Sequence, residues 1–365
     1  MRVLGIMSGT SIDGVDYVLC SITAPERMRF LEHWTIPFSK KLRTDLHRAA
    51  RNESSTCELG EVHHELGRFY AAGASGARVD LVGLHGQTVF HSPGESTLQI
   101  GEAAYLAEIL HAPVVSNFRA ADIAAGGQGA PLATMFHRHA FARKGRHVAV
   151  NNLGGISNVT SLDWHRGREP RILAFDTGPA NVLIDMAARH FSGGKRNFDR
   201  NGQLASKGTV NEPLLRALLK NRYFAAPPPK STGRELFGEP EFRKALRARL
   251  TPEDLLATLV EFTARSIALN YRLHLPSLPD DLILCGGGAQ NPFLFARIAD
   301  ALRELKSEMG IHSSVDLGWH PQVIEGAAFA LLAWLTWNKK PGNIPATTGA
   351  HGARVLGQIA LPIRL

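Results

Sequence analysis

Two short segments combine aspartates with small residues, and each follows an apolar run. The first is MSGTSIDGVD, residues 7–16. Small side chains at a tight turn expose backbone N–H groups, which can surround a phosphate. Asp13 and Asp16 would repel a bare anion, but magnesium accompanying a nucleotide is usually held by one or two carboxylates, waters and phosphate oxygens. This segment is therefore a candidate nucleotide site, with an ordinary hairpin turn as the alternative, because such turns share its composition.

The second segment is FDTGPAN, residues 175–181. We expect a strand to deliver Asp176 to its end, Thr177 and Gly178 to form a second phosphate-sized turn, and a helix to begin near Pro179. The N-terminus of a helix favours an anion. Asp176 would then lie beside a phosphate, where a general base is needed. The alternative is that Asp176 caps the following helix.

A third glycine turn follows an apolar strand in LILCGGGAQNP, residues 282–292. Gly286, Gly287 and Gly288 would let a flat ring such as adenine approach the backbone closely. Asn291 stands where the last glycine of GxGxxG would be, so the dinucleotide-binding pattern is not met. A simple strand-to-helix connection is the alternative.

Two further features carry polar groups without a complete catalytic set. The proline-rich segment PPPKSTGRELF, residues 227–237, presents Lys230 and Arg234. These cations suit an anionic ligand or, alternatively, a solvated surface loop. From residue type alone, His85 in LHGQT is interpreted as a structural residue that forms hydrogen bonds, because it is one of 16 histidines.

The elements that would position these residues alternate between strands and helices. Residues 2–22 predict a strand, a turn and a second strand. Residues 40–76 have apolar positions at helical spacing, and strands are expected at 80–91 and 97–101. A helix and then a strand at 112–119 complete this half, so an α/β sheet is predicted.

The pattern restarts after the glycine-dense segment 124–131, which is the best candidate for a domain boundary or hinge. Residues 147–162 predict a strand, a Gly-Gly turn and a strand, and residues 171–191 predict a strand, a turn and a helix. A further helix has Thr251 as its N-cap and Pro252 at its first position. The restart indicates two related halves that face each other across a cleft.

Length supports this division. A chain of 365 residues exceeds what one core usually holds, roughly 250–300 residues. We predict an N-terminal α/β domain over 1–128 and a C-terminal α/β domain over 129–365. The C-terminal segment is a candidate to return to the first domain.

Composition limits the function classes. With 44% hydrophobic and 20% charged residues the chain is globular, and its net charge of +8 favours acidic partners. Basic residues are not interleaved with aromatic residues, which argues against a nucleic-acid groove.

The longest apolar run, Gly326–Trp337, is well short of the roughly 20 residues that span a bilayer. Three cysteines and no recognisable secretion signal favour the cytoplasm. We expect small-molecule partners, no nucleic acid, no membrane, and a homodimer.

Taken together, the motifs resemble the anhydro-N-acetylmuramic acid kinase family, which belongs to the hexokinase–Hsp70–actin superfamily of ATPases. The resemblance runs from about residue 4 to about residue 335. It is carried by MSGTSIDGVD, LHGQT, NFRAADIAAGGQGAPL, NNLGGISN, FDTGPAN, PPPKSTGRELF, CGGGAQNP and IEGAAFALLA. The chain departs from the family pattern at Asn117, where many relatives have aspartate, and at Ala120 and Ala121, where some have basic residues.

The resemblance implies a two-domain, actin-like, ribonuclease H-like α/β fold that binds ATP and Mg²⁺ in a cleft between the domains. It implies the reaction of 1,6-anhydro-N-acetylmuramate, water and ATP to N-acetylmuramate 6-phosphate and ADP, a step of peptidoglycan recycling. Two alternatives remain open. One is a conventional sugar or carboxylate kinase of the same superfamily, and the other is an ATP-dependent binding protein that transfers no phosphate.

The resemblance also implies roles for individual residues. Asp176 matches the general base, and Asp13 matches a magnesium contact made through water. The substrate positions correspond to His85, Gln87, Arg119, Gln128 and Glu325. The ATP-binding positions correspond to Gly9, Thr10, Ser11, Ile12, Asp13, Gly14, Val15, Asp16, Thr177, Gly178, Gly286, Gly287 and Gly288.

Overall fold

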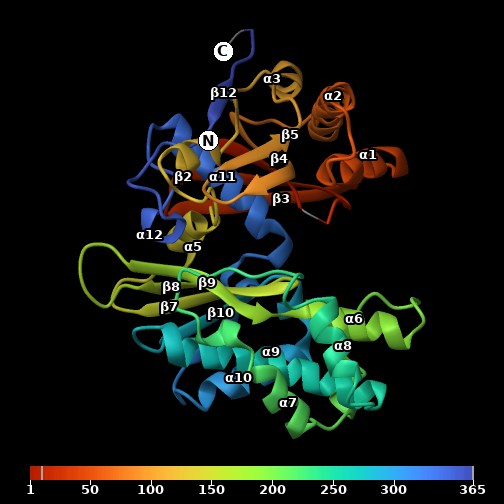
Figure 1. Ribbon diagram of the computed structural model, residues 1–365. Coiled ribbons are helices and arrows are strands. Elements are labelled where there is room, and N and C mark those ends of the chain that lie inside the picture. Colours follow the sequence, from red (N-terminus) through yellow and green to blue (C-terminus); the bar gives the residue numbers. More distant parts are fainter. Residues whose placement is uncertain (10, 364–365) are drawn as a thin grey trace. The chain divides into compact units, whose positions relative to one another are not determined.

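The computed structural model describes residues 1–9 and 11–363. Contacts between residues divide the chain into two units (Figure 1). Unit 1 consists of Met1–Ala140 and Gln322–Leu365, and unit 2 is Phe141–Pro321. The glycine-dense segment 124–131 therefore lies within unit 1, and the C-terminal segment is grouped with the N-terminal part of the chain.

Unit 1 contains a mixed sheet in the order β12–β6–β4–β1–β2–β3, with β5 paired to β4. The first three strands form an antiparallel meander, β4 runs parallel to β1, and β6 runs parallel to β4. The strands are β1 Arg2–Ser8, β2 Gly14–Ala24, β3 Arg27–Pro37, β4 Leu81–Ser92, β5 Ser96–Ile100, β6 Val114–Ser116 and β12 Gln358–Ala360. The helices are α1 Lys40–Ala50, α2 Thr56–Ala74, α3 Ala104–Leu110, α4 Ala120–Ala124, α5 Thr134–Phe141, α11 Ile324–Trp337 and α12 Pro345–Thr348.

Unit 2 repeats this arrangement in the sheet order β9–β8–β7–β10–β11. Again three antiparallel strands are followed by two strands that run parallel to the first of them. The strands are β7 His147–Leu153, β8 Ile156–Asp163, β9 Arg171–Pro179, β10 Asp281–Cys285 and β11 Gly310–Ser313. The α-helices are α6 Asn181–Phe191, α7 Glu212–Leu219, α8 Glu239–Leu246, α9 Pro252–His274 and α10 Pro292–Arg303. The duplicated strand order confirms the predicted ribonuclease H-like α/β fold with two related halves.

Glycines on the central strands of unit 1 let α11 contact the sheet directly. A Cβ added at Gly5 of β1 would lie 1.8 Å from the carbonyl oxygen of Gly326, and one at Gly83 of β4 would lie 2.2 Å from that of Phe329. The apolar run Gly326–Trp337 is therefore a helix that is buried against these strands. Among the described residues, no helix is both long enough and apolar enough to cross a membrane.

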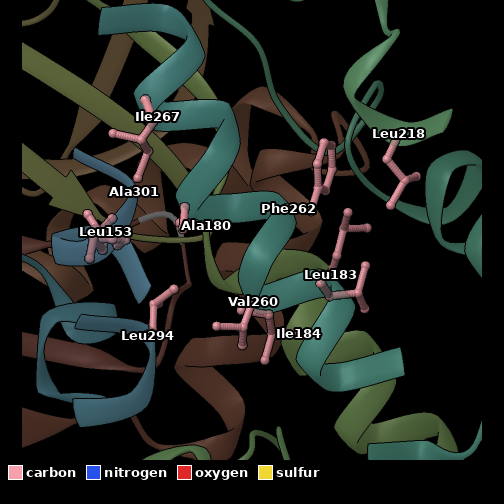
Figure 2. Packing of buried hydrophobic residues seen from close by; sticks show 14 of the residues in the cluster. Leu153, Ala180, Leu183, Ile184, Leu218, Val260, Phe262, Ile267, Leu294 and Ala301 are labelled. Carbon is pink, nitrogen blue, oxygen red and sulfur yellow. The ribbon is translucent and has the colours of Figure 1, made fainter. Parts of the chain in front are cut away.

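Helix α9 forms the centre of the unit 2 core. Figure 2 shows its residues Val260, Phe262 and Ile267 together with Leu153 of β7 and Leu183 of α6. All five side chains are almost completely buried. Full burial of such a side chain contributes about 1.5–3 kcal/mol, so α9 contributes strongly to the stability of the unit 2 core.

The predicted start of α9 is confirmed and gives a first test. The Thr251 side chain accepts a hydrogen bond from the N–H of Asp254 at 3.1 Å, and Pro252 follows it. Thr251→Ala should lower the free energy of unfolding of unit 2 by about 1 kcal/mol, measured by urea denaturation. Ser206→Ala, which removes an exposed hydroxyl and its long, 3.5 Å hydrogen bond to the Gln203 carbonyl, is the control. Equal stability of the two variants would contradict the capping role.

Candidate active site

The first predicted turn connects β1 to β2. It is closed by a hydrogen bond from the N–H of Ile12 to the carbonyl of Gly9 at 3.2 Å, and Ile12 has a left-handed φ of 54°. The Ile12 and Val15 side chains are buried, so only their backbone atoms could contact a nucleotide. Thr10, which also belongs to the predicted ATP-binding set, lies outside the described residues.

The two aspartates of this turn have different surroundings. Asp13 is exposed, and its Oδ1 accepts a hydrogen bond from Ser11 Oγ at 2.9 Å. Asp16 lies in β2, where Oδ1 accepts hydrogen bonds from His33 Nε2 at 2.9 Å and Thr35 Oγ1 at 2.6 Å. Asp16 is therefore held by two residues of β3 although its side chain is 37% exposed, whereas Asp13 is exposed on the turn and is held by the neighbouring Ser11.

Four of the predicted substrate residues lie near one another in unit 1. Arg119 Nη2 is 2.9 Å from His85 Nε2, and Arg119 Nη1 donates to the carbonyl of Gly129 at 2.7 Å. Gln87 follows His85 on β4 and donates to the carbonyl of Gly9 at 3.1 Å, which links it to the first turn. Burial lowers the pKa of Arg119, and the charge of Glu325, in the first turn of α11, opposes this shift.

The electrostatics of this group follow from burial. Burial, and secondarily the Arg119 charge, lowers the pKa of His85 to about 3, so the ring is neutral and Nε2 accepts from Arg119. Burial also raises the pKa of Glu325, with a smaller contribution from the Asp16 charge, while Arg119 opposes the shift. Among the described residues, His85 Nδ1, Gln87 Oε1 and Arg119 Nε are buried without a hydrogen-bond partner.

Gln128 lies on a loop that a buried aspartate holds in place. Its N–H donates to the carbonyl of Thr348 at 2.7 Å, and its side chain is exposed. Asp122 Oδ2 accepts from the N–H of Gly129, while Oδ1 accepts from Asn343 and Thr348. The segment interpreted as a hinge is thus tied to the C-terminal part of unit 1.

In unit 2, Asp176 lies near the end of β9 and is held by the segment 223–232. Its Oδ2 accepts from the N–H of Thr232 at 2.8 Å, its own N–H donates to the carbonyl of Lys230, and its carbonyl accepts from Tyr223 Oη. Burial raises the pKa of Asp176 to about 6, an effect that the Thr232 hydrogen bond opposes and the Glu235 charge reinforces.

The prediction that Thr177 and Gly178 form a tight turn is wrong. Strand β9 continues through Thr177 and Gly178 to Pro179, with a register shift opposite Ser157 and Asn158. The Thr177 hydroxyl is buried and donates to Ser157 Oγ at 2.6 Å. Thr177 and Gly178 therefore belong to a β-bulge, since pairing with β8 extends the strand beyond Asp176. The capping alternative for Asp176 is also excluded, because α6 has Ala180 as N-cap and no side-chain cap.

The three glycines after β10 have distinct roles. Gly286 has a φ of 80°, and a Cβ there would lie 2.4 Å from Asn152 Oδ1. A Cβ at Gly288 would meet Leu153 at 2.8 Å, whereas one at Gly287 would face open space. Packing against β7 therefore explains Gly286 and Gly288, and Gly287 is the position open to a ligand.

Residue types and spacing do not single out Tyr223 and Thr232, which bind the backbone carbonyl and the carboxylate of Asp176. Lys230 of the same segment is a predicted contact for an anionic ligand, whereas in the structure its Nζ donates to the carbonyls of Tyr223 and Phe224, each at 3.2 Å. The sequence signal available was the segment 227–237 itself, whose side-chain directions depend on contacts far along the chain. The described residues contain no cluster of three or more histidine, cysteine, aspartate or glutamate side chains that could hold a metal ion.

Comparison with known proteins gives a consistent result. Residues 1–362 match the sequence profile of the family described as anhydro-N-acetylmuramic acid kinase. A protein of that name from Burkholderia orbicola is 42% identical over 97% of this chain and 95% of its own length. Another, from Acaryochloris marina, is 38% identical over 99% of this chain and 100% of its own. The chain therefore belongs to the anhydro-N-acetylmuramic acid kinase family, and it is an ATP-using kinase that acts on a small molecule.

Proposed function

We propose that Asp176 is the general base with which this kinase activates water to open the 1,6-anhydro ring of N-acetylmuramate. The observation that supports this proposal is the environment of the Asp176 carboxyl group. Burial raises its pKa to about 6, Oδ2 is held by Thr232, and Oδ1 has no hydrogen-bond partner among the described residues. A base that is deprotonated at neutral pH, with one oxygen free, suits proton removal from water.

The substrate's structure explains why a base is needed. O6 of the anhydro sugar is bonded to C1, so no free 6-hydroxyl is available for phosphorylation. Water forms a bond to C1 as the C1–O6 bond breaks, and O6 forms a bond to the γ-phosphorus of ATP as ADP leaves. The proton of the attacking water passes to Asp176, and the product is N-acetylmuramate 6-phosphate.

The polar group of unit 1 is our candidate for the sugar contacts. Three buried polar atoms, on His85, Gln87 and Arg119, have no partner among the described residues. Leaving such an atom unpaired costs about 1–3 kcal/mol, and a bound sugar could supply the missing partners. Arg119 also offers a positive charge to the lactyl carboxylate. Glu325 and the exposed side chain of Gln128 complete this proposed set.

For the nucleotide, we propose contacts from the residues between Gly9 and Asp16, from Thr177 and Gly178, and from the loop Gly286–Gly288. Magnesium would neutralise phosphate charge and polarise the γ-phosphoryl group. The accessible Asp13 carboxylate fits a magnesium ion that takes its other ligands from water and phosphate, since Mg²⁺ needs only one or two protein carboxylates. Ser11, which donates to Asp13, would orient that carboxylate.

Both proposed substrates are anions, which agrees with the net charge of +8. The excess positive charge does not require nucleic acid or a membrane surface as a partner. A cytoplasmic homodimer remains part of the proposal, and light scattering of the purified protein tests the dimer.

A panel of sugars in an ADP-release assay tests the activity. ADP release should require 1,6-anhydro-N-acetylmuramate and should be absent with glucose, N-acetylglucosamine and N-acetylmuramate. Robust phosphorylation of an ordinary hexose without anhydro-sugar activity would favour the conventional kinase. ATP binding with no phosphate transfer to any sugar would favour the binding protein.

The pKa of Asp176 predicts the pH dependence of the reaction. Only the deprotonated carboxylate accepts a proton, so kcat/KM should fall about tenfold per pH unit below a midpoint near pH 6. Measurement of kcat/KM between pH 4.5 and 8 checks this. An acid limb near pH 4, the ordinary range for an aspartate, would contradict the assignment.

A further inference from the structure

We infer that the segment Tyr223–Thr232 positions the base, holding Asp176 through three hydrogen bonds so that Oδ1 takes the proton, and that Lys230 keeps this segment closed. The inference rests on the proposed role of Asp176. It assigns a function to the proline-rich motif 227–237, which has no direct role in the proposed reaction.

The three hydrogen bonds reach both sides of the Asp176 backbone and its side chain. Thr232 N–H lies 2.8 Å from Oδ2, Tyr223 Oη lies 2.8 Å from the Asp176 carbonyl, and the Asp176 N–H lies 3.1 Å from the Lys230 carbonyl. Together they fix the end of β9 and the rotation of the carboxyl group. Since Thr232 occupies Oδ2, the geometry selects Oδ1 as the proton acceptor.

Lys230 connects the two ends of the segment. Its Nζ donates to the carbonyls of Tyr223 and Phe224 and lies 4.8 Å from the centre of the Tyr223 ring and 5.7 Å from that of Phe175. Burial lowers the pKa of this ammonium group to about 8. A surface lysine that served only solubility would not be half-buried with its ammonium group against two carbonyls and near two rings.

The segment is in turn anchored in the unit 2 core. Phe224 is 2% exposed, its ring contacts Phe237 and Phe262, and its carbonyl is 2.7 Å from His274 Nε2. A Cβ at Gly178 would lie 2.9 Å from the Phe224 ring, so β9 and the segment approach closely. The position of Asp176 therefore depends on packed residues that touch neither the sugar nor ATP in the proposed mechanism.

The hydroxyl oxygen of Thr232 indicates that a ligand binds beside the carboxyl group of Asp176. Thr232 Oγ1 is buried and has no hydrogen-bond partner among the described residues. The hydroxyl belongs to the same residue that holds Asp176 Oδ2, so a ligand bound beside the carboxyl group would be its natural partner.

Two substitutions test the positioning role. Tyr223→Phe removes only the hydroxyl that binds the Asp176 carbonyl, and Lys230→Met keeps the length of the side chain but removes its donors. We expect kcat to fall about 3- to 10-fold for Tyr223→Phe and 10- to 100-fold for Lys230→Met, because small displacements of a reacting group are costly. KM for ATP should change less than threefold. Lys220→Met, on an exposed lysine of the same unit, is the matched control and should retain full activity.

A double-mutant cycle separates positioning from general damage. In the Asp176→Asn background, Tyr223→Phe and Lys230→Met should each cost less than twofold further, because their effect passes through the base. The acid limb of kcat/KM should also shift in Lys230→Met, since a displaced segment changes both the burial of Asp176 and the Thr232 hydrogen bond, which together set its pKa.

Equal losses with and without Asp176, or an unchanged acid limb with reduced kcat, would overturn the positioning role. If Lys230→Met does not fold, as judged by its melting curve, the cycle with Tyr223→Phe decides alone. Wild-type turnover by Asp176→Asn would instead overturn the proposed function, so the two failures are distinguishable.

Discussion

Asp176→Asn should bind ATP and 1,6-anhydro-N-acetylmuramate but lose between 10²- and 10⁴-fold in kcat, the usual contribution of a general base. The amide has the shape of the carboxyl group, and its oxygen can still accept the Thr232 N–H that is 2.8 Å from Oδ2. The substitution therefore removes the proton acceptor and leaves the geometry. Single-turnover measurement of product formation, together with calorimetric binding of ATP, gives the two quantities separately.

Asp185→Asn is the matched control. Asp185 is also in unit 2, and burial raises its pKa to about 6 as well, while the charges of Arg189 and Arg234 oppose the shift. It is interpreted as structural, so its variant should stay within a few-fold of wild-type turnover. Equal losses in the two variants would contradict the choice of Asp176.

Asp176→Asn should also change the stability of the folded protein. The pKa of Asp176 is about 6 in the folded protein and 3.8 in the unfolded chain, so its contribution to stability is present below about pH 4 and is lost as pH rises through 6. Asparagine does not ionise, so Asp176→Asn does not lose this stability as the pH rises. Its melting temperature should therefore exceed that of the wild type at pH 7.5, and the gain should shrink towards pH 4.

Asp122→Ala is expected to have the largest effect on folding, about 3–5 kcal/mol in the free energy of unfolding, because it takes the acceptor away from three buried donors at about 1–3 kcal/mol each. The Asp122 side chain is fully buried and accepts from Gly129 N–H, Asn343 Nδ2 and Thr348 Oγ1. Truncation takes the carboxylate away from all three donors. Because Gly129 also receives a hydrogen bond from Arg119, affinity for the sugar should fall as well.

Urea denaturation of the full chain measures this effect. Asp45→Ala is the control, because within the described part of the chain the half-buried Asp45 pairs with the exposed Lys41 alone, and such solvent-accessible ion pairs contribute about 1 kcal/mol or less. A loss below 1 kcal/mol for Asp122→Ala would show that the loop 124–131 does not depend on this network.

Much of the fold is predictable because its signals are local. The alternation of apolar residues around the first turn predicts β1 and β2, and the Thr251–Pro252 pair predicts the start of α9. The strand expected at 112–119 is shorter, Val114–Ser116, because Asn117 takes a left-handed φ of 55° and ends it. The bulge at Thr177 depends on pairing with Ser157, a contact 20 residues away that local pattern does not contain.

The site is predictable as a set of residues but not as an arrangement. Motifs and family resemblance name His85, Gln87 and Arg119. Only the structure places Arg119 against His85 and shows that three of their buried atoms have no hydrogen-bond partner among the described residues. The contacts of Asp176 with Tyr223 and Thr232 span 47 and 56 residues. Side-chain direction over such separations is fixed by core packing, which sequence periodicity does not specify.

Turnover in ¹⁸O-labelled water tests the central claim, that water opens the ring while O6 receives the phosphate. The reaction is stopped early, and the positions of the label in the product are found by mass spectrometry of its fragments. Unlabelled N-acetylmuramate 6-phosphate kept in the same water for the same time corrects for exchange at C1. The account predicts one labelled oxygen at C1 and none in the phosphate group. Label in the phosphate, or no label above the exchange control, would contradict it.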